Sequence, residues 1–359
     1  MARKMKQSTR GYAGYSSPAG RAQAFDAAGA SGLAFLQSQL ELIDTDLTEP
    51  LQAVTHPRDI TVETGGGFPQ FLSAWASNYG TTGTQSYGLQ GTNNTELPEA
   101  QADIQKGIWP TYIWALGMTI SWVDLQRMEF ATRTGQAPPF SLQELYENAI
   151  ETTWVKALDF VVYAGFLGGA ALINNPNAPE YVVPAGGSGS TTWAKKTPQE
   201  ILTDVNTAQN QTMQNSGYAA AEGMCDRLLI PYSQFATLTQ PQAIGGVPVA
   251  MSTIEYIEKN CVATHHGVKF VVNSLPDPWI AGQGVGNTAA VGQTGNGLDR
   301  GVFYKNSKKS LYIRIPQVFT KAMTVPTTRV GPGYETAYVG CISSCIFKRT
   351  TTMTYTDGI

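Results

Sequence analysis

The chain has 359 residues, and its 27 acidic and 24 basic side chains leave a formal net charge of −3. Charged residues make up 14% of the chain, against about 25% in a typical soluble domain, which favours large protein–protein contact areas over a freely soluble monomer. The length supports a sizeable core or several compact lobes, and the absence of any run of about 18 apolar residues excludes a transmembrane helix and a membrane partner.

The first 25 residues are basic and contain no acidic side chain. Arg3, Lys4, Lys6 and Arg10 are spaced among Gly, Ser and Ala, a composition that predicts a flexible arm. The segment lacks the apolar core of a signal peptide, so we expect production in the cytoplasm. Two interpretations of the arm remain open: contact with an anionic partner such as nucleic acid, and a solvated tail.

A long alternating pattern occupies residues 108–122. Its even positions are largely apolar: Ile108, Pro110, Tyr112, Trp114, Leu116, Met118, Ile120 and Trp122. Side chains at every second position share one face of a strand, so the pattern predicts a strand about 50 Å long. A usual strand has five or six residues, so this one is expected to extend beyond the domain that anchors it.

A second strand is predicted at residues 60–63, pairing with the long strand. The polar, glycine-rich residues 77–107 then form the tip of a two-stranded arm. Such a ribbon is only marginally stable alone, and its exposed aromatic side chains favour contact with a neighbouring surface. The alternative is a bent strand that wraps one closed core, with Gly117 supplying the bend.

Four aromatic residues of the long strand are the predicted subunit contacts. They are Trp109, Tyr112, Trp114 and Trp122. Their large rings offer the most apolar area on an arm that has no core of its own.

A long helix is predicted from Leu142 to Ala164. Ser141 stands at the N-cap position and Glu144 three residues later, which is the capping-box spacing, and Gly165 favours termination. At ~1.5 Å per residue the helix is roughly 35 Å long. Its predicted buried face consists of Leu142, Ile150, Trp154, Ala157, Leu158, Val161 and Val162, while a second stripe contains Asp159 and Tyr163.

Two further helices carry the same N-terminal signature. Thr197 and Glu200 enclose Pro198 at the first helical position, and Gly217 follows the end of that pattern. Ser252 and Glu255 open another helix, which is expected to run to about residue 260. Strands are predicted within 225–235 and 267–275, a hairpin over 301–323, and one final long strand over 336–355.

The four cysteines are Cys225, Cys261, Cys341 and Cys345. None of their spacings matches a zinc site, and Cys341 and Cys345 lie ~13 Å apart along one strand, too far for a disulfide. We predict free, mostly buried thiols.

One arrangement permits a catalytic interpretation. His265 and His266 follow Cys261 closely, so a metal site or a Cys/His hydrolase is conceivable, although helix-end histidines beside the negative helix terminus are the simpler explanation. No H-E-x-x-H, G-x-S-x-G or phosphate-binding glycine motif occurs. We therefore predict no catalytic, cofactor-binding or metal-binding residue, and a protein that is not an enzyme.

The order of these features resembles the major capsid proteins of tailed bacteriophages. The loop GGAALINNPN is similar to the Gly…Leu-x-Asn-x-Pro turn after the family's spine helix. TTWAKKTPQEILTDVN is similar to the entry of the next helix in one branch, and DRLLIPYSQF and FKRTTTMTYTDGI are similar to the same branch. The resemblance extends from about residue 30 to the end of the chain.

This resemblance implies an α+β fold of the Hong Kong 97 type. Its expected parts are an N-terminal arm at 1–50, an extended β-hairpin loop with flanking strands at 51–125, a peripheral domain with a long spine helix at 126–165, a mainly axial domain at 166–335, and a C-terminal strand at 336–359 that returns to the peripheral domain. Some relatives cross-link a lysine of the extended loop to an asparagine of the next subunit. Lys106 is the lysine near the loop here, but no acid is placed to assist it, so we expect no cross-link.

The function implied is that of a major capsid protein, which self-assembles into the icosahedral head shell around double-stranded phage DNA. The expected partners are the protein itself as hexamers and pentamers, the portal, scaffolding and decoration proteins, and packaged DNA near Arg3, Lys4, Lys6 and Arg10. The expected location is the virion, after assembly in the host cytoplasm. The alternatives are an encapsulin-type bacterial nanocompartment and, from another class, a hydrolase that uses Cys261 with His265.

Overall fold

The computed structural model describes residues 53–81, 99–133, 141–167, 169–244, 247–282, 297–328 and 332–359. The chain divides into two units, Met1–Leu51 and Gln52–Ile359, and the described residues all belong to the second. The predicted DNA-facing residues Arg3, Lys4, Lys6 and Arg10 therefore lie outside the described residues. The second unit combines helices with parallel and antiparallel strands, so the expected mixed α+β class is confirmed.

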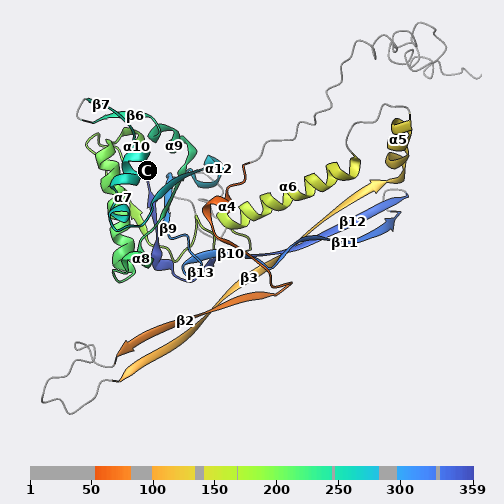
Figure 1. The fold of residues 1–359 in the computed structure, drawn as a ribbon, viewed down its shortest axis with the longest axis horizontal. Helices are drawn as coiled ribbons and strands as arrows, with labels where there is room; N and C mark the ends of the chain where they lie inside the picture. The colour runs from red at the N-terminus through yellow and green to blue at the C-terminus, as the bar shows by residue number, and fades with distance from the viewer. Residues whose placement is uncertain are drawn as a thin grey trace, which may run out of the picture. The chain divides into compact units, whose positions relative to one another are not determined.

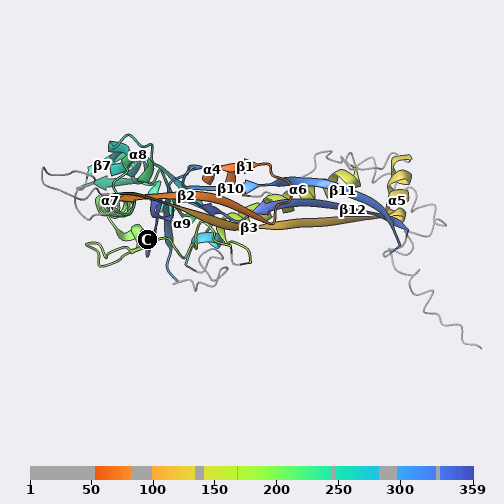
Figure 2. The same cartoon turned by 90° about the horizontal axis from the view of Figure 1, so that it is seen from below.

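The strand β3 (Ala100–Ser121) takes part in two different pairings along its length. Its first half pairs antiparallel with β2 (Phe71–Thr81), and its second half pairs antiparallel with β12 (Gly333–Ser343). The strand β11 (Gln317–Thr327) completes a sheet of order β11-β12-β3-β2. Both views show β3 continuing from its β2-paired end to the end beside β11 and β12 (Figures 1 and 2).

The predicted long strand is confirmed, but its partner and limits are corrected. Residues 62–64 form β1 (Val62–Thr64), which pairs parallel with β10 (Leu311–Ile315) and not with β3. Part of the predicted polar tip at 77–107 is strand, and Trp122 begins the helix α5 (Trp122–Arg133). The sequence did not predict these strand residues because neither face of the β2–β3 ribbon packs on the core of the chain, so the residues do not alternate strictly between apolar and polar.

The predicted long helix is α6 (Leu142–Tyr163). The Ser141 hydroxyl accepts a hydrogen bond from the backbone N–H of Glu144 at 3.1 Å, as the capping pattern predicts. Trp154, on its buried face, meets Trp114 of β3 and Phe319 of β11 with ring centroids 5.1 and 5.6 Å apart. These contacts anchor α6 to the sheet.

The buried face of α6 is wider than the apolar stripe predicts. Asp159 is buried and its carboxylate lies 2.6 Å from the ring Nδ1 of His56, in the short helix α4 (His56–Asp59). Tyr163 is also buried and donates a hydrogen bond to Asp59 at 2.8 Å. Asp159 and Tyr163 can be buried because each forms a hydrogen bond with a residue of α4. The periodicity of the helix sequence does not predict such a partner.

A five-stranded sheet forms the second major layer. Its order is β4 (Glu180–Val182), β14 (Met353–Asp357), β9 (Arg300–Tyr304), β5 (Arg227–Pro231) and β8 (Val271–Leu275). Residues of α7 (Pro198–Asn215) and α10 (Thr253–Asn260) share an apolar core with β5 and β9. Both helices begin where their capping patterns predict.

The smaller elements connect these layers. They are β13 (Ile346–Phe347), paired with β10; the hairpin β6 (Pro241–Ile244) and β7 (Val247–Ser252); the helices α8 (Ala220–Gly223), α9 (Tyr232–Leu238), α11 (Val262–His265) and α12 (Asp277–Ile280); and the 3-10 turns η1 (Trp193–Lys195) and η2 (Thr350–Thr352). Among the described helices, none is long and apolar enough to cross a membrane.

Two strand predictions near the C-terminus are wrong. The expected hairpin over 301–323 is separate strands, since β9 and β10 belong to different sheets. The expected single strand over 336–355 is divided into β12, β13, η2 and β14. The break at Ser344 and Cys345 was hidden because both residues are buried and neither is Gly or Pro. The break at Lys348 and Arg349 lies at the surface and also lacks Gly and Pro.

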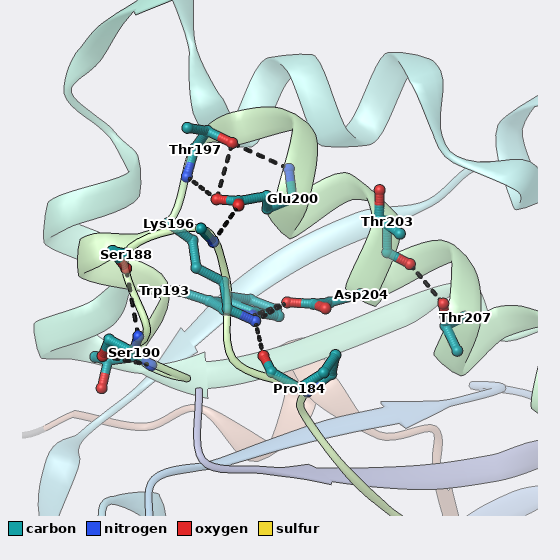
Figure 3. Close-up of polar contacts among 12 residues, drawn as sticks. Pro184, Ser188, Ser190, Trp193, Lys196, Thr197, Glu200, Thr203, Asp204 and Thr207 are labelled. Carbon is teal, nitrogen blue, oxygen red and sulfur yellow. Dashed lines mark hydrogen bonds and ion pairs between the residues drawn. The ribbon is translucent and has the colours of Figure 1, made fainter.

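The loop before α7 is tied to the helix by a buried ion pair (Figure 3). The ammonium of Lys196 donates to Asp204 at 2.7 Å and to the carbonyl of Pro184 at 2.6 Å. The indole of Trp193 donates to the same carboxylate at 3.1 Å. Burial raises the pKa of Asp204, and the Lys196 ammonium opposes that shift.

The cap of α7 supplies a stability test. Thr197 accepts from the N–H of Glu200, whose carboxylate accepts from the N–H of Thr197 in return (Figure 3). Thr197→Ala removes the first of these acceptors and is expected to lower the free energy of unfolding by about 1 kcal/mol. Thr197→Ser keeps the hydroxyl and is the control. In thermal unfolding followed by circular dichroism, the alanine variant should have a lower midpoint than the wild type and the serine variant. Equal midpoints would contradict the prediction.

Candidate subunit interface

The β2–β3 ribbon gathers its large exposed apolar side chains on one face. Directly opposed residues of an antiparallel pair share a face, and the faces alternate along each strand. Phe71, Trp75 and Tyr79 of β2 therefore lie on the same face as residues 104 and 108 of β3, which oppose Ser77 and Ser73. We call this set the ribbon face: Phe71, Trp75, Tyr79, Ile104 and Ile108.

The ribbon face is exposed in the single chain. Its five side chains retain between 57% and 82% of their accessible surface. The opposite face carries small or polar residues at Ala74, Ala76, Gln105 and Gly107, and its large apolar residues are the half-buried pair Leu72 and Trp109. An apolar group of this size gathered on one face marks a contact surface, whereas single exposed apolar residues do not.

Charge is also present on the ribbon face. The ammonium of Lys106, opposite Trp75 in register, lies 5.6 Å from the centroid of the indole ring. A cation over an aromatic ring at this distance is attracted by the ring quadrupole. The contact orients Trp75 while leaving most of its ring accessible.

The ribbon face continues along β3 into the core of the same chain. The even-numbered residues from Tyr112 to Met118 follow Ile108 on the same side of the strand. There Met118 packs with Ile150 of α6 and Trp114 with Trp154. One apolar stripe is thus covered by α6 along its second half and left bare along its first half.

The four predicted contact residues occupy different surroundings. Tyr112 donates a hydrogen bond to the carbonyl of Phe166 at 2.5 Å, and partial burial raises the pKa of its hydroxyl. Trp114 packs on α6, and Trp122 is exposed on α5. Their contact with another subunit, like that of Trp109, stays a prediction.

Trp109 lies on the face of the ribbon opposite the ribbon face. Its ring folds back along its own strand, so a Cβ placed at Gly107 would lie 2.4 Å from the Cη2 atom of the indole. The absence of a side chain at Gly107 is what allows this close approach. Trp109 is therefore partly covered by its own strand.

The three β2 residues of the ribbon face were missed by the sequence analysis. Phe71, Trp75 and Tyr79 recur at every fourth position, with serines at 73 and 77 between them. That spacing places all three on one side of a strand, but the polar serines interrupt the alternation. A search for aromatic residues at even intervals would have identified this face.

The described residues do not bring together a Cys/His pair at Cys261. Its sulfur lies 3.2 Å from the hydroxyl of Thr264 and is buried, while His265 and His266 are exposed. All four cysteines are free and buried, as predicted, and burial raises the pKa of Cys225 and Cys345 to about 12. In the described part of the chain, no group of three or more His, Cys, Asp or Glu side chains is placed to hold a metal ion.

Comparison with known proteins gives one family match and several structural likenesses. A family model described as major capsid protein matches residues 88–359. The capsid of Myoviridae phage XM1 has a TM-score of 0.66 at 12% identity, over 90% of this chain and 98% of that chain. No curated protein matches the sequence.

Two further capsid structures share the fold. The capsid of an empty GTA particle has a TM-score of 0.56 at 9% identity, over 91% of this chain and 98% of that chain. The mature capsid of bacteriophage PhiM1 has a TM-score of 0.54 at 11% identity, over 88% and 91% of the two chains.

The exposure of Trp75 can be tested in solution on the isolated chain. Trp75→Phe removes an indole that retains 69% of its surface, so the fraction of tryptophan fluorescence quenched by acrylamide should fall. Trp154→Phe removes a buried indole and should raise that fraction. A change of the same sign in both variants would contradict the bare ribbon face.

Proposed function

The chain belongs to the major capsid protein family and is a structural protein of the phage head shell, and from this premise we propose that the ribbon face closes the shell by lying on neighbouring copies. The observation that carries the proposal is the apolar stripe of β3, which α6 covers for half of its length only. A second copy of the chain supplies the missing cover in a shell built of identical subunits.

We assign the parts of the Hong Kong 97-type fold on the same basis. The β2–β3 ribbon is the extended loop within 51–125, and α6 is the spine helix within 126–165. Four strands of the five-stranded sheet belong to the mainly axial region 166–335, and its fifth strand, β14, comes from the C-terminal segment. Residues 1–50 are the N-terminal arm, and residues 336–359 supply the returning C-terminal segment. The likeness to the phage XM1 capsid over most of both chains supports these assignments.

Magnitudes explain why one ribbon contact is weak and a shell is stable. Burying a large apolar side chain contributes roughly 1.5–3 kcal/mol, so the ribbon face supplies about 7–15 kcal/mol. Association and ordering cost an estimated 4–15 kcal/mol, which offsets most of that gain. A single pair of copies therefore separates readily, whereas a closed shell sums many such contacts.

The remaining partners follow from the same proposal. Copies gather as hexamers and pentamers, with portal, scaffolding and decoration proteins, and the basic arm contacts packaged DNA. Assembly takes place in the host cytoplasm and the product is the virion. The family match supports this assignment over a nanocompartment shell and supports a protein that is not an enzyme.

The test uses two neighbouring residues of β3 that face opposite ways. Ile104→Asp puts a charge on the ribbon face, and Gln105→Asp puts the same charge on the other side of the ribbon. Both positions are exposed, so neither variant should alter folding, which circular dichroism checks. The chain is co-expressed with its neighbouring genes, and particles are counted by negative-stain microscopy and sedimentation.

We expect Ile104→Asp to lower particle yield at least tenfold and Gln105→Asp to assemble as the wild type does. The reason is that a carboxylate buried against an apolar surface is strongly penalised, whereas one left in water is not. Wild-type yield from Ile104→Asp would refute the proposed role of the ribbon face. Failure of the wild-type chain to form particles would refute the shell itself.

A further inference from the structure

Two basic segments far apart in the sequence meet at the start of β10. The first is the loop 305–310 with the strand that follows it, and the second is Lys348-Arg349 after β13. The backbone N–H groups of Lys348 and Arg349 both donate to the carbonyl of Ser310, at 2.9 and 3.3 Å. We call the resulting cluster the basic patch: Lys305, Lys308, Lys309, Arg314, Lys348 and Arg349.

The basic patch holds more positive than negative charge. Its six cations are served by three carboxylates: Asp226 beside Lys305, Glu63 beside Lys308 and Arg314, and Glu222 beside Lys309 and Arg349. Subtracting three from six leaves +3, in a chain whose total is −3. The ammonium of Lys348 lies 4.8 Å above the ring of Tyr312.

The three carboxylates differ in depth. Glu63 lies beneath its cations, since its side chain is 18% exposed and those of Lys308 and Arg314 are 61% and 36% exposed. Asp226 and Lys305 are both largely buried, whereas Glu222 is exposed beside Lys309 and Arg349. Hydrogen bonds from Lys309 and Arg349 lower the pKa of Glu222 to about 2, so this carboxylate is charged at neutral pH. The surface presented to solvent is positive because the cations outnumber the carboxylates and the most exposed ion-paired side chains of the patch are those of Lys308 and Lys309.

The loop that carries the lysines is held in place before any partner arrives. Asp226 accepts the N–H of Asn306 at 2.8 Å, and the Asn306 side chain accepts the N–H of Thr61 at 2.9 Å. The N–H of Ser310 donates to the carbonyl of Ser307 at 2.9 Å. A fixed loop loses little conformational entropy on binding, so its charges are available at low cost.

The surroundings of the basic patch distinguish an anionic polymer from a protein partner. Among the described residues, none of the large exposed apolar side chains comes from 305–315 or 345–352. Protein interfaces have apolar cores and are depleted in lysine, whereas phosphate contacts are made by lysine and arginine. The basic patch has the second composition.

We propose that the basic patch binds the phosphate backbone of duplex DNA, as a second DNA contact besides the N-terminal arm. The choice of DNA as the polyanion rests on the proposed function, in which the shell encloses a DNA genome. Recognition is by charge and carries no sequence preference, because no element of the patch is a helix or ribbon shaped to enter a groove.

The test measures how salt weakens binding of the full chain, before assembly, to a 30-base-pair duplex of random sequence. The variant Lys308→Gln/Lys309→Gln/Arg349→Gln removes three exposed cations. Each lost phosphate contact flattens the plot of log affinity against log salt concentration by about 0.9, so the slope should decrease by about 2 to 3. Fluorescence anisotropy between 50 and 200 mM salt provides the slope.

A matched control removes the same charge elsewhere. Lys195, Lys259 and Lys269 are exposed residues of η1, α10 and the segment before β8, and their replacement by Gln should leave the slope at the wild-type value. The arm is intact in every variant, so differences in slope report the basic patch alone. Equal slopes for the two triple variants would overturn the proposal.

A gain of binding gives an independent result. Glu222→Gln removes an exposed carboxylate and raises the net charge of the patch from +3 to +4, so affinity at 50 mM salt should increase severalfold. Unchanged or weaker binding would count against the proposal.

Particle formation separates this inference from the function on which it rests. A triple patch variant that loses shell assembly but keeps the wild-type salt slope would overturn DNA binding in favour of a contact between copies. Normal particles with a flattened slope would support it. Failure of the wild-type chain to form particles concerns the shell proposal alone.

Discussion

The structure depends on one apolar stripe along β3, which is buried against α6 in one half and exposed in the other. From Tyr112 to Met118 the stripe packs against α6 and gives the chain its own core. From Ile104 to Ile108 the same side of the strand is bare and is joined by the aromatic residues of β2.

The remainder of the described chain provides a rigid support for that strand. Buried polar groups are paired with one another: His56 with Asp159 joins α4 to α6, which are distant in the sequence, and Lys196 with Asp204 joins the loop before α7 to that helix. Pairs of this kind contribute little net stability but penalise any arrangement that separates them. They suit a subunit that must present one geometry to many neighbours. The basic patch also uses ion pairs between segments far apart in the sequence, as between Glu222 and Arg349.

Prediction from sequence worked where the signal was local. The starts of α6, α7 and α10 were found because an N-cap side chain and its partner are three residues apart and act within one turn. Prediction failed at β2 because Ser73 and Ser77 interrupt the apolar residues on one face, and it failed at the pairing of β1 because strand pairing joins residues far apart in sequence. The break between β12 and β13 was missed for a related reason, because Ser344 and Cys345 turn inside the core.

By itself, the sequence determined the caps, the length of α6 and an apolar stripe along β3, because each depends on residues within a few positions of one another. Tertiary structure alone decided which half of that stripe is covered, which strand completes the ribbon, and that residues 305–314 and 348–349 form one positive surface. These outcomes depend on which distant segments share a hydrogen bond or a packing surface, and a linear pattern contains no record of that choice.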